Sequence, residues 1–496
     1  MKKHYVLLGS ILLVAALLRL FNLTAISLWH DEAFSALLVN YSWQEMFYRI
    51  GLDVHPPFYY VILRLWSDVF GHSLFALRGF SVFFGIATVW AGYGFVKVAF
   101  KKESLALATA LLIAVNPFQI QYVTEARMYT LGTFLLLISG YFLVKAFDTK
   151  KIVYWLGFIL STSAAMYTHY YLFFSIFGIG LFALYYLFKN YRLELKKYSQ
   201  LVFSYIIVLL LYVPWLKTFK YQFTQVQENY WIPKMHEWSV PLTNWRMIFG
   251  TGADSNNPIT KVFLVIASLF TIFLVYRVIK KEKSIYKWLA LLGTIVPFLG
   301  ALLLSFKQSI YLDRYFLFAG LFYTILLCLF IFELSNKKLK YGIYILMVAV
   351  SILNWWGFWS SMDIKHKPGM SSAASYLNNN IEQGDILLIG SSSEFFNFKF
   401  YNRSTASPLL YIPGISEVKQ LPHFSGTALL TNAELIHDLN KDVEKGSTVW
   451  TLWTNAFGGV KPEVPQNWVQ IGQDHSWEDV RPFAGTWIMV DEYLVK

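Results

Sequence analysis

Long apolar segments separated by short polar loops fill the first 360 residues of the chain. A helix that crosses a membrane needs about 20 mainly apolar residues. The pattern therefore predicts eleven transmembrane helices, over 5–23, 74–98, 104–121, 127–147, 152–169, 171–188, 200–219, 260–279, 286–306, 315–334 and 341–360. The boundary within 152–188 is the least defined, because only Thr168, His169 and Tyr170 separate two spans.

Basic residues gather in every second loop between these spans. Short cytoplasmic loops carry an excess of Lys and Arg, so this alternation sets the orientation. It predicts a cytoplasmic N-terminus. The basic loops hold Lys97, Lys101 and Lys102; Lys145, Lys150 and Lys151; Lys189, Arg192, Lys196 and Lys197; Arg277, Lys280, Lys281, Lys283 and Lys287; and Lys337, Lys338 and Lys340.

Two of the external loops are long, 24–73 and 220–259. In the first, two prolines open the segment Pro56–Phe70, and proline suits the start of a helix. Apolar and aromatic residues then recur at helical spacing, which indicates a helix lying along the membrane interface. The second loop is rich in Gln, Asn, Trp and Gly, and we expect it to fold over the membrane face as a mobile lid.

The pattern changes after residue 360. Segment 361–496 reads as a soluble α/β domain, which the number of preceding spans places outside the cytoplasm. The expected elements are a helix over 371–380, a buried strand over 385–390, strands over 427–430 and 448–452, and a short helix over 433–439.

Composition supports the membrane interpretation. The 496 residues are 56% hydrophobic and 15% charged, whereas a soluble domain is about 25% charged. The net charge of +12 is uneven: residues 361–496 hold ten basic and fifteen acidic side chains, and the first 360 hold 32 and 15. The basic excess follows from topology, so nucleic acid is not an expected partner.

Other patterns narrow the chemistry. The single cysteine, Cys328, excludes an intrachain disulfide and a cysteine metal site. No convincing small-residue cleavage site precedes Arg19, so the N-terminal apolar stretch is interpreted as an uncleaved first span. The glycine pairs at 178/180 and 458/459 lack the context of a phosphate-binding or dinucleotide-binding loop.

The unusual polar residues all fall on the external side of this topology, although only the basic loops were used to set it. Carboxylates near lipid must be solvated or paired, which makes such a cluster a candidate site. The group comprises Asp31, Glu32, Asp53, His55, Arg78, Glu125, Arg127, Tyr129, His169, Asp313, Arg314 and Tyr315. Arginines bind phosphate through charge-assisted bonds, and a carboxylate can accept a proton from an attacking hydroxyl. Group transfer from a lipid phosphate fits this set.

Four motifs in order resemble glycosyltransferase family 39, the membrane group with protein O-mannosyltransferases and the lipid A aminoarabinose transferase. They are Leu28-Trp29-His30-Asp31-Glu32-Ala33, His55-Pro56-Pro57-Phe58-Tyr59-Tyr60, Ala76-Leu77-Arg78-Gly79-Phe80-Ser81 and Glu125-Ala126-Arg127-Met128-Tyr129. The resemblance covers roughly residues 1–330. It implies an α-helical GT-C fold, a polyprenyl-phosphate-linked sugar donor, inversion at the anomeric carbon and a site on the outer leaflet.

By position, the resemblance implies a catalytic or acceptor-binding role for Asp31, with Glu32 beside it. It implies donor-phosphate contacts for His55, Arg78, Arg127 and, more loosely, Arg314. Glu125, Tyr129 and His169 are expected to support them. The chain lacks the inserted luminal domain of the eukaryotic mannosyltransferases and has its own domain 361–496, which puts a protein acceptor in doubt.

Each of these residues also has a structural explanation. Asp31 and His55 could cap helices, and Glu32 could cap, pack or bind metal. Arg78 could snorkel to the interface, His169 could be a turn histidine, and Glu125–Arg127 and Asp313–Arg314 could be local ion pairs. Asp31, Glu32, Asp53 and His55 could also form a weak divalent-metal site.

The resulting hypothesis is a membrane glycosyltransferase that moves a sugar from a polyprenyl-phosphate donor to an extracytoplasmic glycan, lipid or protein, in a bacterium. One alternative is a lipid-linked-sugar transporter or flippase. Transporters place ionisable residues near the bilayer midplane, whereas these lie at the outer rim. The other is an envelope assembly protein that acts through 361–496.

Overall fold

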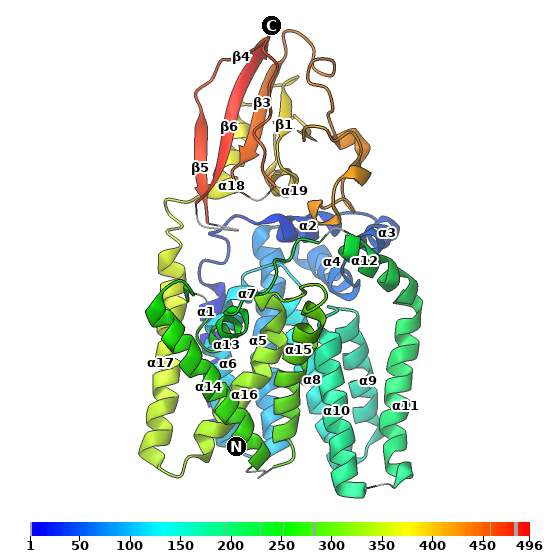
Figure 1. The fold of residues 1–496 in the computed structure, drawn as a ribbon, viewed down its shortest axis with the longest axis vertical. Helices are drawn as coiled ribbons and strands as arrows, with labels where there is room; N and C mark the ends of the chain where they lie inside the picture. The colour runs from blue at the N-terminus through cyan, green and yellow to red at the C-terminus, as the bar shows by residue number, and fades with distance from the viewer. Residues whose placement is uncertain are drawn as a thin grey trace.

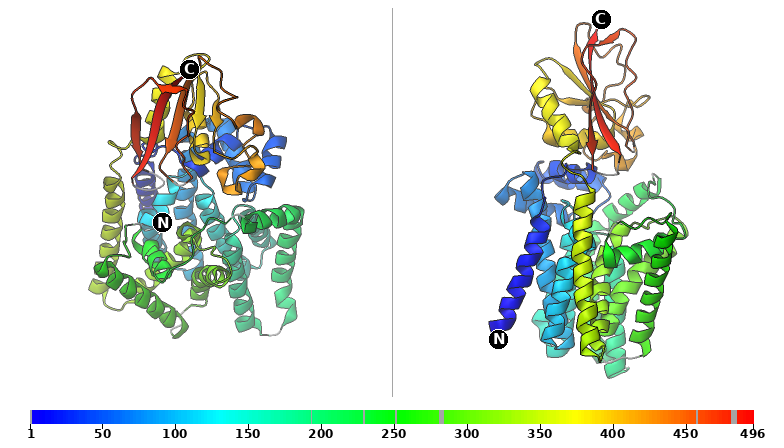
Figure 2. Two further views of the ribbon diagram at one scale, coloured as in Figure 1. Left: turned by 45° about the horizontal axis from the view of Figure 1, so that its top comes forward. Right: turned by 90° about the vertical axis from the view of Figure 1, so that its left-hand side faces the viewer.

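The computed structural model describes residues 2–192, 194–228, 230–250, 252–280, 284–456, 458–480 and 485–496. It has a helical bundle, a small sheet domain at one end of the bundle, and a layer of short helices between the two (Figure 1). The N-terminus lies at the end of the bundle far from the sheet domain (Figures 1 and 2).

Twelve of the described helices, most of them long, make up the bundle. They are α1 (Lys2–Leu20), α5 (Leu74–Phe100), α6 (Glu103–Val115), α7 (Pro117–Val123), α8 (Tyr129–Thr149), α9 (Ile152–Met166), α10 (Leu172–Tyr191), α11 (Leu195–Tyr212), α14 (Pro258–Lys280), α15 (Lys287–Ser305), α16 (Leu317–Glu333) and α17 (Lys337–Ser361). In the described segments, nine helices are long and apolar enough to cross a membrane. The pair α6 and α7, bent by 55°, is either a broken span or a re-entrant loop, and α9 is a shorter apolar helix.

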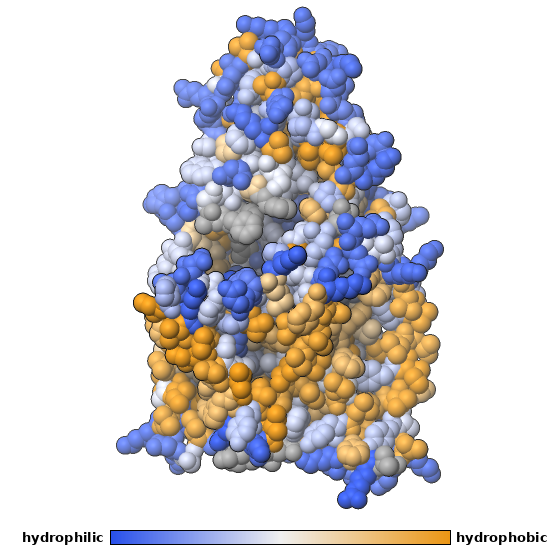
Figure 3. Space-filling view, in the orientation of Figure 1, coloured by the Kyte–Doolittle hydropathy of each residue, from blue (hydrophilic) through white to orange (hydrophobic). Residues whose placement is uncertain are grey.

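These helices coincide with the eleven predicted spans, so the polytopic helical fold is confirmed. On the face seen in Figure 3, apolar surface forms a band across the bundle, and polar residues gather above and below it. Lys281 and Lys283, two members of one predicted basic loop, lie outside the described residues. The assignment of one end to the cytoplasm remains a prediction.

The central helix of the bundle is α16, which packs against α6, α8 and α15. Most of its side chains are buried. Small residues let its neighbours approach closely, as in other membrane bundles. A Cβ added to Gly132 of α8 would lie 2.7 Å from the Phe318 ring, and one at Gly293 of α15 would lie 2.5 Å from the Phe322 ring.

Short helices cover the bundle on the side of the sheet domain. They are α2 (His30–Leu38), α3 (Trp43–Leu52), α4 (Phe58–Phe70), α12 (Leu216–Glu228), which follows the 3-10 turn η1 (Val213–Trp215), and α13 (Ser239–Phe249). The helix predicted after the two prolines is confirmed as α4, with Pro57 as its N-cap. The predicted loop 220–259 is largely helical, and its mobility remains a prediction.

The sheet domain contains α18 (Gly369–Asn380), α19 (Ser392–Tyr401) and six strands, β1 (Ile386–Ile389), β2 (Pro408–Leu410), β3 (Thr448–Thr454), β4 (Trp468–Gln470), β5 (His475–Asp479) and β6 (Thr486–Val495). The strand order is β2-β1-β3-β6-β4, and β5 also pairs with β6. β1 runs parallel to β2 and β3, and β6 runs antiparallel to its three neighbours. The predicted helix 371–380 and the strands over 385–390 and 448–452 are confirmed.

Two predicted elements of this domain are wrong. Segment 427–430 is a turn, because the carbonyls of Ala428 and Leu429 accept hydrogen bonds from Arg49 of α3 instead of from a strand. Segment 433–439 is not a helix beyond the 3-10 turn η5 (Asn432–Glu434). Leu435 instead forms a parallel bridge with Leu410, which keeps the chain extended beside β2.

Candidate functional site

Asp31 lies in the first turn of α2, between two arginines from distant parts of the chain. Its Oδ2 is 3.9 Å from Nη2 of Arg127, which precedes α8, and 3.8 Å from Nη1 of Arg314. Arg314 belongs to the 3-10 turn η2 (Asp313–Phe316) that leads into α16. The Asp31 side chain is 26% exposed, and those of Arg127 and Arg314 are 3% and 14% exposed. The fold therefore brings these three predicted residues together.

Opposing effects set the ionisation of Asp31. Burial raises the pKa of its carboxyl, but the positive charges of Arg127 and Arg314 outweigh burial and hold the pKa below the ordinary value of 3.8. The start of α2 adds a favourable dipole for a carboxylate. Asp31 is therefore an anion at neutral pH.

Arg127 is fixed by contacts with the first external loop. Its Nη1 donates to the backbone oxygen of Asp31 at 3.0 Å and to Oγ of Ser35 at 3.2 Å. Its Nη2 lies 3.3 Å from Nε2 of His55. In the described parts of the chain, the buried Nε of Arg127 and the buried Nε of Arg314 have no hydrogen-bond partner. Buried donors are rarely left unpaired. Other arginines also have a buried Nε without a partner, and what sets Arg127 and Arg314 apart is that both lie beside the Asp31 carboxylate.

His55 joins this arrangement to a second carboxylate. Its Nδ1 lies 3.0 Å from Oδ2 of Asp53. An arginine can only donate, so Nε2 of His55 accepts from Arg127 and the proton is assigned to Nδ1, which donates to Asp53. The chain Asp53–His55–Arg127 thus joins a second carboxylate to the guanidinium.

Aromatic rings surround Arg314. Its guanidinium lies 5.2 Å from the ring centre of Trp29, 5.6 Å from Trp231 and 5.9 Å from Tyr315. Asp313 does not pair with Arg314. The Asp313 carboxylate instead forms an ion pair with Arg246 of α13 and accepts a hydrogen bond from Thr243. Arg314 therefore faces Asp31 between Trp29 of the first loop and Trp231 of the second.

Glu32 and Arg78 form a different kind of pair. Nε and Nη2 of Arg78 each donate to Glu32 at 2.8 Å, and both side chains are almost fully buried. Nη1 and Nη2 also donate to the backbone oxygens of Leu23, Ile26 and Ser27. Oε1 of Glu32 accepts from the backbone N–H of Ala126 at 2.8 Å. This network closes the first loop against the turn before α8 and leaves Arg78 without a spare N–H for a phosphate.

The three supporting residues lie around the same turn. Glu125 is buried, and Ser81 donates to its backbone oxygen at 2.6 Å. The ring of His169 lies 6.2 Å from that of His55 and 5.8 Å from that of Tyr129. Its Nδ1 accepts from the backbone N–H of Tyr171 at 3.1 Å. Burial, with the nearby positive charges, lowers the pKa of His169 well below 6.5, so this histidine is neutral.

The metal site considered for Asp31, Glu32 and His55 has little support in the described residues. In the described ranges, no three His, Cys, Asp or Glu side chains lie close enough to hold a metal ion. Glu32 is bound by Arg78, and the nearest charged groups to the Asp31 carboxylate are arginines. The arrangement suits an anion.

Sequence reasoning missed several contacts of this site. Ser35 lies one turn after Asp31 on α2, a spacing that could have identified it. No sequence pattern around Trp231 could have identified it as part of the site. The docking of the sheet domain on α2 was also missed: Nδ1 of His30 lies 3.4 Å from the backbone oxygen of Ser393, and the hydroxyl of Tyr401 accepts from the backbone N–H of Leu28 at 3.0 Å.

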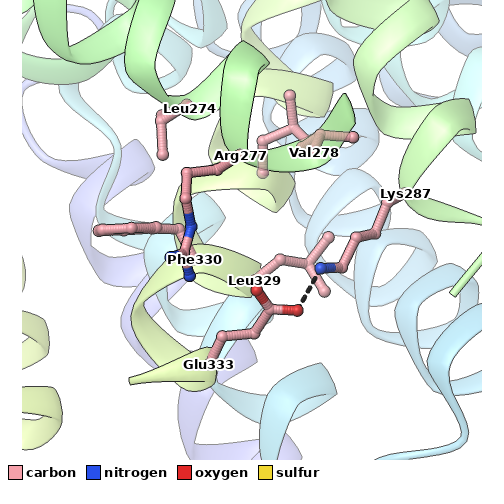
Figure 4. A pocket seen from close by; sticks show the side chains of 8 residues that line it. Leu274, Arg277, Val278, Lys287, Leu329, Phe330 and Glu333 are labelled. Carbon is pink, nitrogen blue, oxygen red and sulfur yellow. Dashed lines mark hydrogen bonds and ion pairs between the residues drawn. The ribbon is translucent and has the colours of Figure 1, made fainter. Parts of the chain in front are cut away.

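Two hollows lie away from this cluster. A cavity of about 20 Å³, room for one water molecule, lies where α14 ends, α15 begins and α16 ends (Figure 4). Lys287 and Glu333 form an ion pair on its wall. An open depression of about 510 Å³ lies on α3, along Ser42, Glu45 and Tyr48. Neither is lined by Asp31, Arg127 or Arg314.

Comparisons with known proteins concern the family and the fold of the chain. The family model described as dolichyl-phosphate-mannose-protein mannosyltransferase matches residues 54–217. A crystal structure of ArnT from Cupriavidus metallidurans bound to undecaprenyl phosphate has a TM-score of 0.61 and 12% identity, covering 98% of this chain and 97% of that one. The apo structure of that protein gives 0.64 and 12%, with 99% and 98% covered. A search of curated proteins finds no match.

The matched region contains His55, Arg78 and Arg127, and the first motif with Asp31 precedes it. At 12% identity, the ArnT structures show the fold and not the substrate. The resemblance to glycosyltransferase family 39 is confirmed, and the whole chain is a multi-pass membrane protein with the GT-C fold.

Proposed function

We propose that this protein transfers a sugar from a polyprenyl-phosphate donor to an extracytoplasmic acceptor, with inversion at the anomeric carbon. The observation that carries the proposal is the ionised Asp31 held 3.8–3.9 Å from two arginines, each with a buried Nε that lacks a partner in the described structure. A carboxylate beside two arginines that each keep an unpaired N–H suits a reaction in which an acceptor loses a proton and a phosphate leaves.

The donor phosphate binds between Arg127 and Arg314 in this proposal. The two unpaired Nε–H groups would donate to its oxygens, as arginines do with phosphate. Negative charge grows on the phosphate as the C1–O bond of the sugar breaks, and fixed guanidinium groups stabilise it. His55 orients Arg127 through the 3.3 Å contact. Undecaprenyl phosphate bound to the structurally similar ArnT supports a lipid donor of this class.

Asp31 orients the acceptor hydroxyl and takes its proton as the new C1–O bond forms, which releases the polyprenyl phosphate. A carboxylate of lowered pKa is a weak base, so the departure of the phosphate must supply most of the driving force. Glu32 and Arg78 have structural roles here, because each is bound within the protein. They hold α2, and thus Asp31, against the turn that carries Arg127.

The acceptor belongs to one of three classes, a cell-envelope glycan, a lipid or a protein, on the outer face of the plasma membrane. The sheet domain lies on the same side of the bundle as α2, which carries Asp31 (Figure 1). With a cytoplasmic N-terminus, this side is extracytoplasmic. Trp231 of the second loop lies over Arg314 and would exclude water from the phosphate.

The test is release of radiolabelled sugar from polyprenyl-phosphate donors by purified protein in nanodiscs, with crude envelope extract as the acceptor source. We expect the wild type to release label and Asp31→Asn to lose at least about 100-fold, in the range of one lost catalytic proton transfer. Asp68→Asn is the matched control, because Asp68 is an exposed carboxylate on α4. Full turnover by Asp31→Asn, or no release from any donor by the wild type, would overturn the proposal.

A further inference from the structure

Arg19 is a buried charge that the proposed reaction does not use. It lies in the last turn of α1 and is 1% exposed. In the portions of the chain that the structure describes, its hydrogen bonds all go to backbone oxygens. Ionisable residues within membrane spans are costly, and they usually mark a function. The contacts of Arg19 therefore have to offset the cost of burying its charge.

The guanidinium of Arg19 donates to the end of a neighbouring helix. Nη1 lies 2.7 Å from the backbone oxygen of Ala114, and Nη2 lies 3.2 Å from that of Ile113. In a continuous helix, the oxygen of Ile113 would accept from the N–H of residue 117, which is a proline and has none. The partner of Ala114 would be Phe118, which lies beyond the 55° bend between α6 and α7. Arg19 therefore supplies donors that the break removes.

The charge of Arg19 also fits this place. The carboxyl end of a helix carries a partial negative charge, so a cation there is stabilised without a carboxylate. The neighbouring helix leaves room for it: a Cβ added to Gly85 of α5 would lie 3.2 Å from Nε of Arg19 and 2.8 Å from the side chain of Val123. Arg19 and the end of α7 thus pack against the same point of α5.

The short helix α7 connects the two sides of the phosphate site. At its start, Nδ2 of Asn116 donates to the backbone oxygen of Met247 at 3.0 Å. Nε2 of Gln119 donates to the backbone oxygen of Leu317, three residues after Arg314, also at 3.0 Å. At its other end, Arg127 comes four residues after Val123, where α7 ends. The angle of α7 therefore sets where Arg127 stands relative to Arg314.

We propose that Arg19 is a positioning residue for the transfer reaction: it stabilises the break between α6 and α7 and so fixes the spacing of Arg127 and Arg314. The proposal rests on the proposed function, because the spacing matters only if the two arginines hold one phosphate. An error of about 1 Å in such a spacing can cost about 100-fold in rate.

The first experiment measures sugar release, binding of polyprenyl phosphate and the thermal unfolding midpoint for Arg19→Gln and Arg19→Lys. We expect Arg19→Gln to lower kcat about 100-fold and to weaken polyprenyl phosphate binding about 10-fold. Arg19→Lys, which keeps a charged donor, should recover part of both. Arg403→Gln is the matched control, because exposed Arg403 also donates only to backbone oxygens. Wild-type rates and binding for Arg19→Gln would overturn the proposal.

A second variant separates positioning from simple stabilisation. Pro117→Ala gives the Ile113 oxygen an N–H partner, so Arg19→Gln/Pro117→Ala should regain thermal stability. It should also straighten the break, so polyprenyl phosphate binding and turnover should stay low. Recovery of binding together with stability would show a structural role and overturn the proposal. If the wild type transfers no sugar, the proposed function fails, and the binding measurements still decide whether Arg19 sets the anion site.

Discussion

Two neighbouring acidic residues on α2 have opposite environments. Glu32 has direct 2.8 Å hydrogen bonds to Arg78 and Ala126 and is fully buried. Asp31, one residue earlier, is partly exposed and lies almost 4 Å from its arginines. A satisfied buried pair holds structure, whereas a looser charged group can exchange partners with a substrate. In the proposed reaction, the sequence motif Asp31–Glu32 therefore combines a reactive residue with a structural one.

The first prediction concerns the buried pair. Glu32→Gln should lower the free energy of unfolding by about 3–5 kcal/mol, because it leaves the buried Arg78 charge without a counter-charge. Thermal unfolding in detergent measures the loss. Glu32→Gln/Arg78→Met should be more stable than Glu32→Gln alone, since it removes the stranded charge. Unchanged unfolding of Glu32→Gln would show that the pair is not structural.

The second prediction concerns the pH dependence of transfer. Arg127 and Arg314 hold the pKa of Asp31 below 3.8 against the opposing effect of burial, so the wild type should lose activity only as the pH falls below that value. Arg314→Met removes one lowering charge, so the Asp31 pKa should rise and activity should be lost at a higher pH. The measurement is kcat/KM against pH. Arg277→Met, at the far end of the bundle, should keep the wild-type profile.

At the scale of elements, apolar length and prolines predicted the helices of the bundle and α4, although in the described residues nine helices are long enough to span, α6 and α7 form a bent pair and α9 is shorter. The two wrong elements of the sheet domain have a common cause. Segment 427–430 has a strand-like composition. However, Arg49, almost 380 residues earlier, donates hydrogen bonds to two of its backbone carbonyls. Sequence patterns report local preference and cannot report such a distant partner.

The same limit applies to the site. Motif order identified Asp31, Arg127 and His55, which the structure brings together, and it also identified Arg78, whose donors are all engaged within the protein. A motif shows that an arginine belongs to the region. Only the fold shows which arginine keeps an N–H group free for a ligand.

The third prediction concerns the second external loop. Trp231→Ala should raise the KM for the lipid donor about 5-fold with a smaller effect on kcat, because a cation–π contact with Arg314 contributes about 1 kcal/mol. Steady-state kinetics with varied donor measure it. Trp238→Ala is the matched control, since Trp238 lies beside Lys261. An equal effect of both substitutions would contradict a specific role for Trp231.

At the scale of the whole molecule, the sheet domain is docked on the loop that carries Asp31. Ser27 donates to the backbone oxygen of Pro368, Tyr401 accepts from Leu28, and Arg49 donates to Ala428. α19 packs along α2. The domain is thus positioned to support the site.

The fourth prediction concerns the stability of this domain. Burial, with the nearby charge of Asp479, raises the pKa of Glu394 on α19 to about 7 from 4.5. The folded state therefore holds a proton that the unfolded state releases above pH 4.5. Stability should fall by at most about 3 kcal/mol as the pH rises from 4.5 to 7, and stay level above 7.

Glu394→Gln removes this titration. Its unfolding free energy should change less than that of the wild type between pH 5 and pH 8, and it should be the more stable protein at pH 8. Unfolding of the full-length protein by denaturant at the two pH values measures both. Glu444→Gln, an exposed site in the same domain, should retain the wild-type difference. Parallel pH curves for wild type and Glu394→Gln would contradict the prediction.

The docking of the sheet domain on α2 also links the end of biosynthesis to its beginning. α2 emerges from the ribosome with the first span, yet the residues that fix Leu28 and His30 in place, Tyr401 and Ser393, are translated more than 360 residues later. We therefore expect the nascent protein to insert its helices before the loop that carries Asp31 is docked against the sheet domain. Such a delay would keep an unfinished chain from acting on the lipid-linked sugars of the membrane into which it is being inserted.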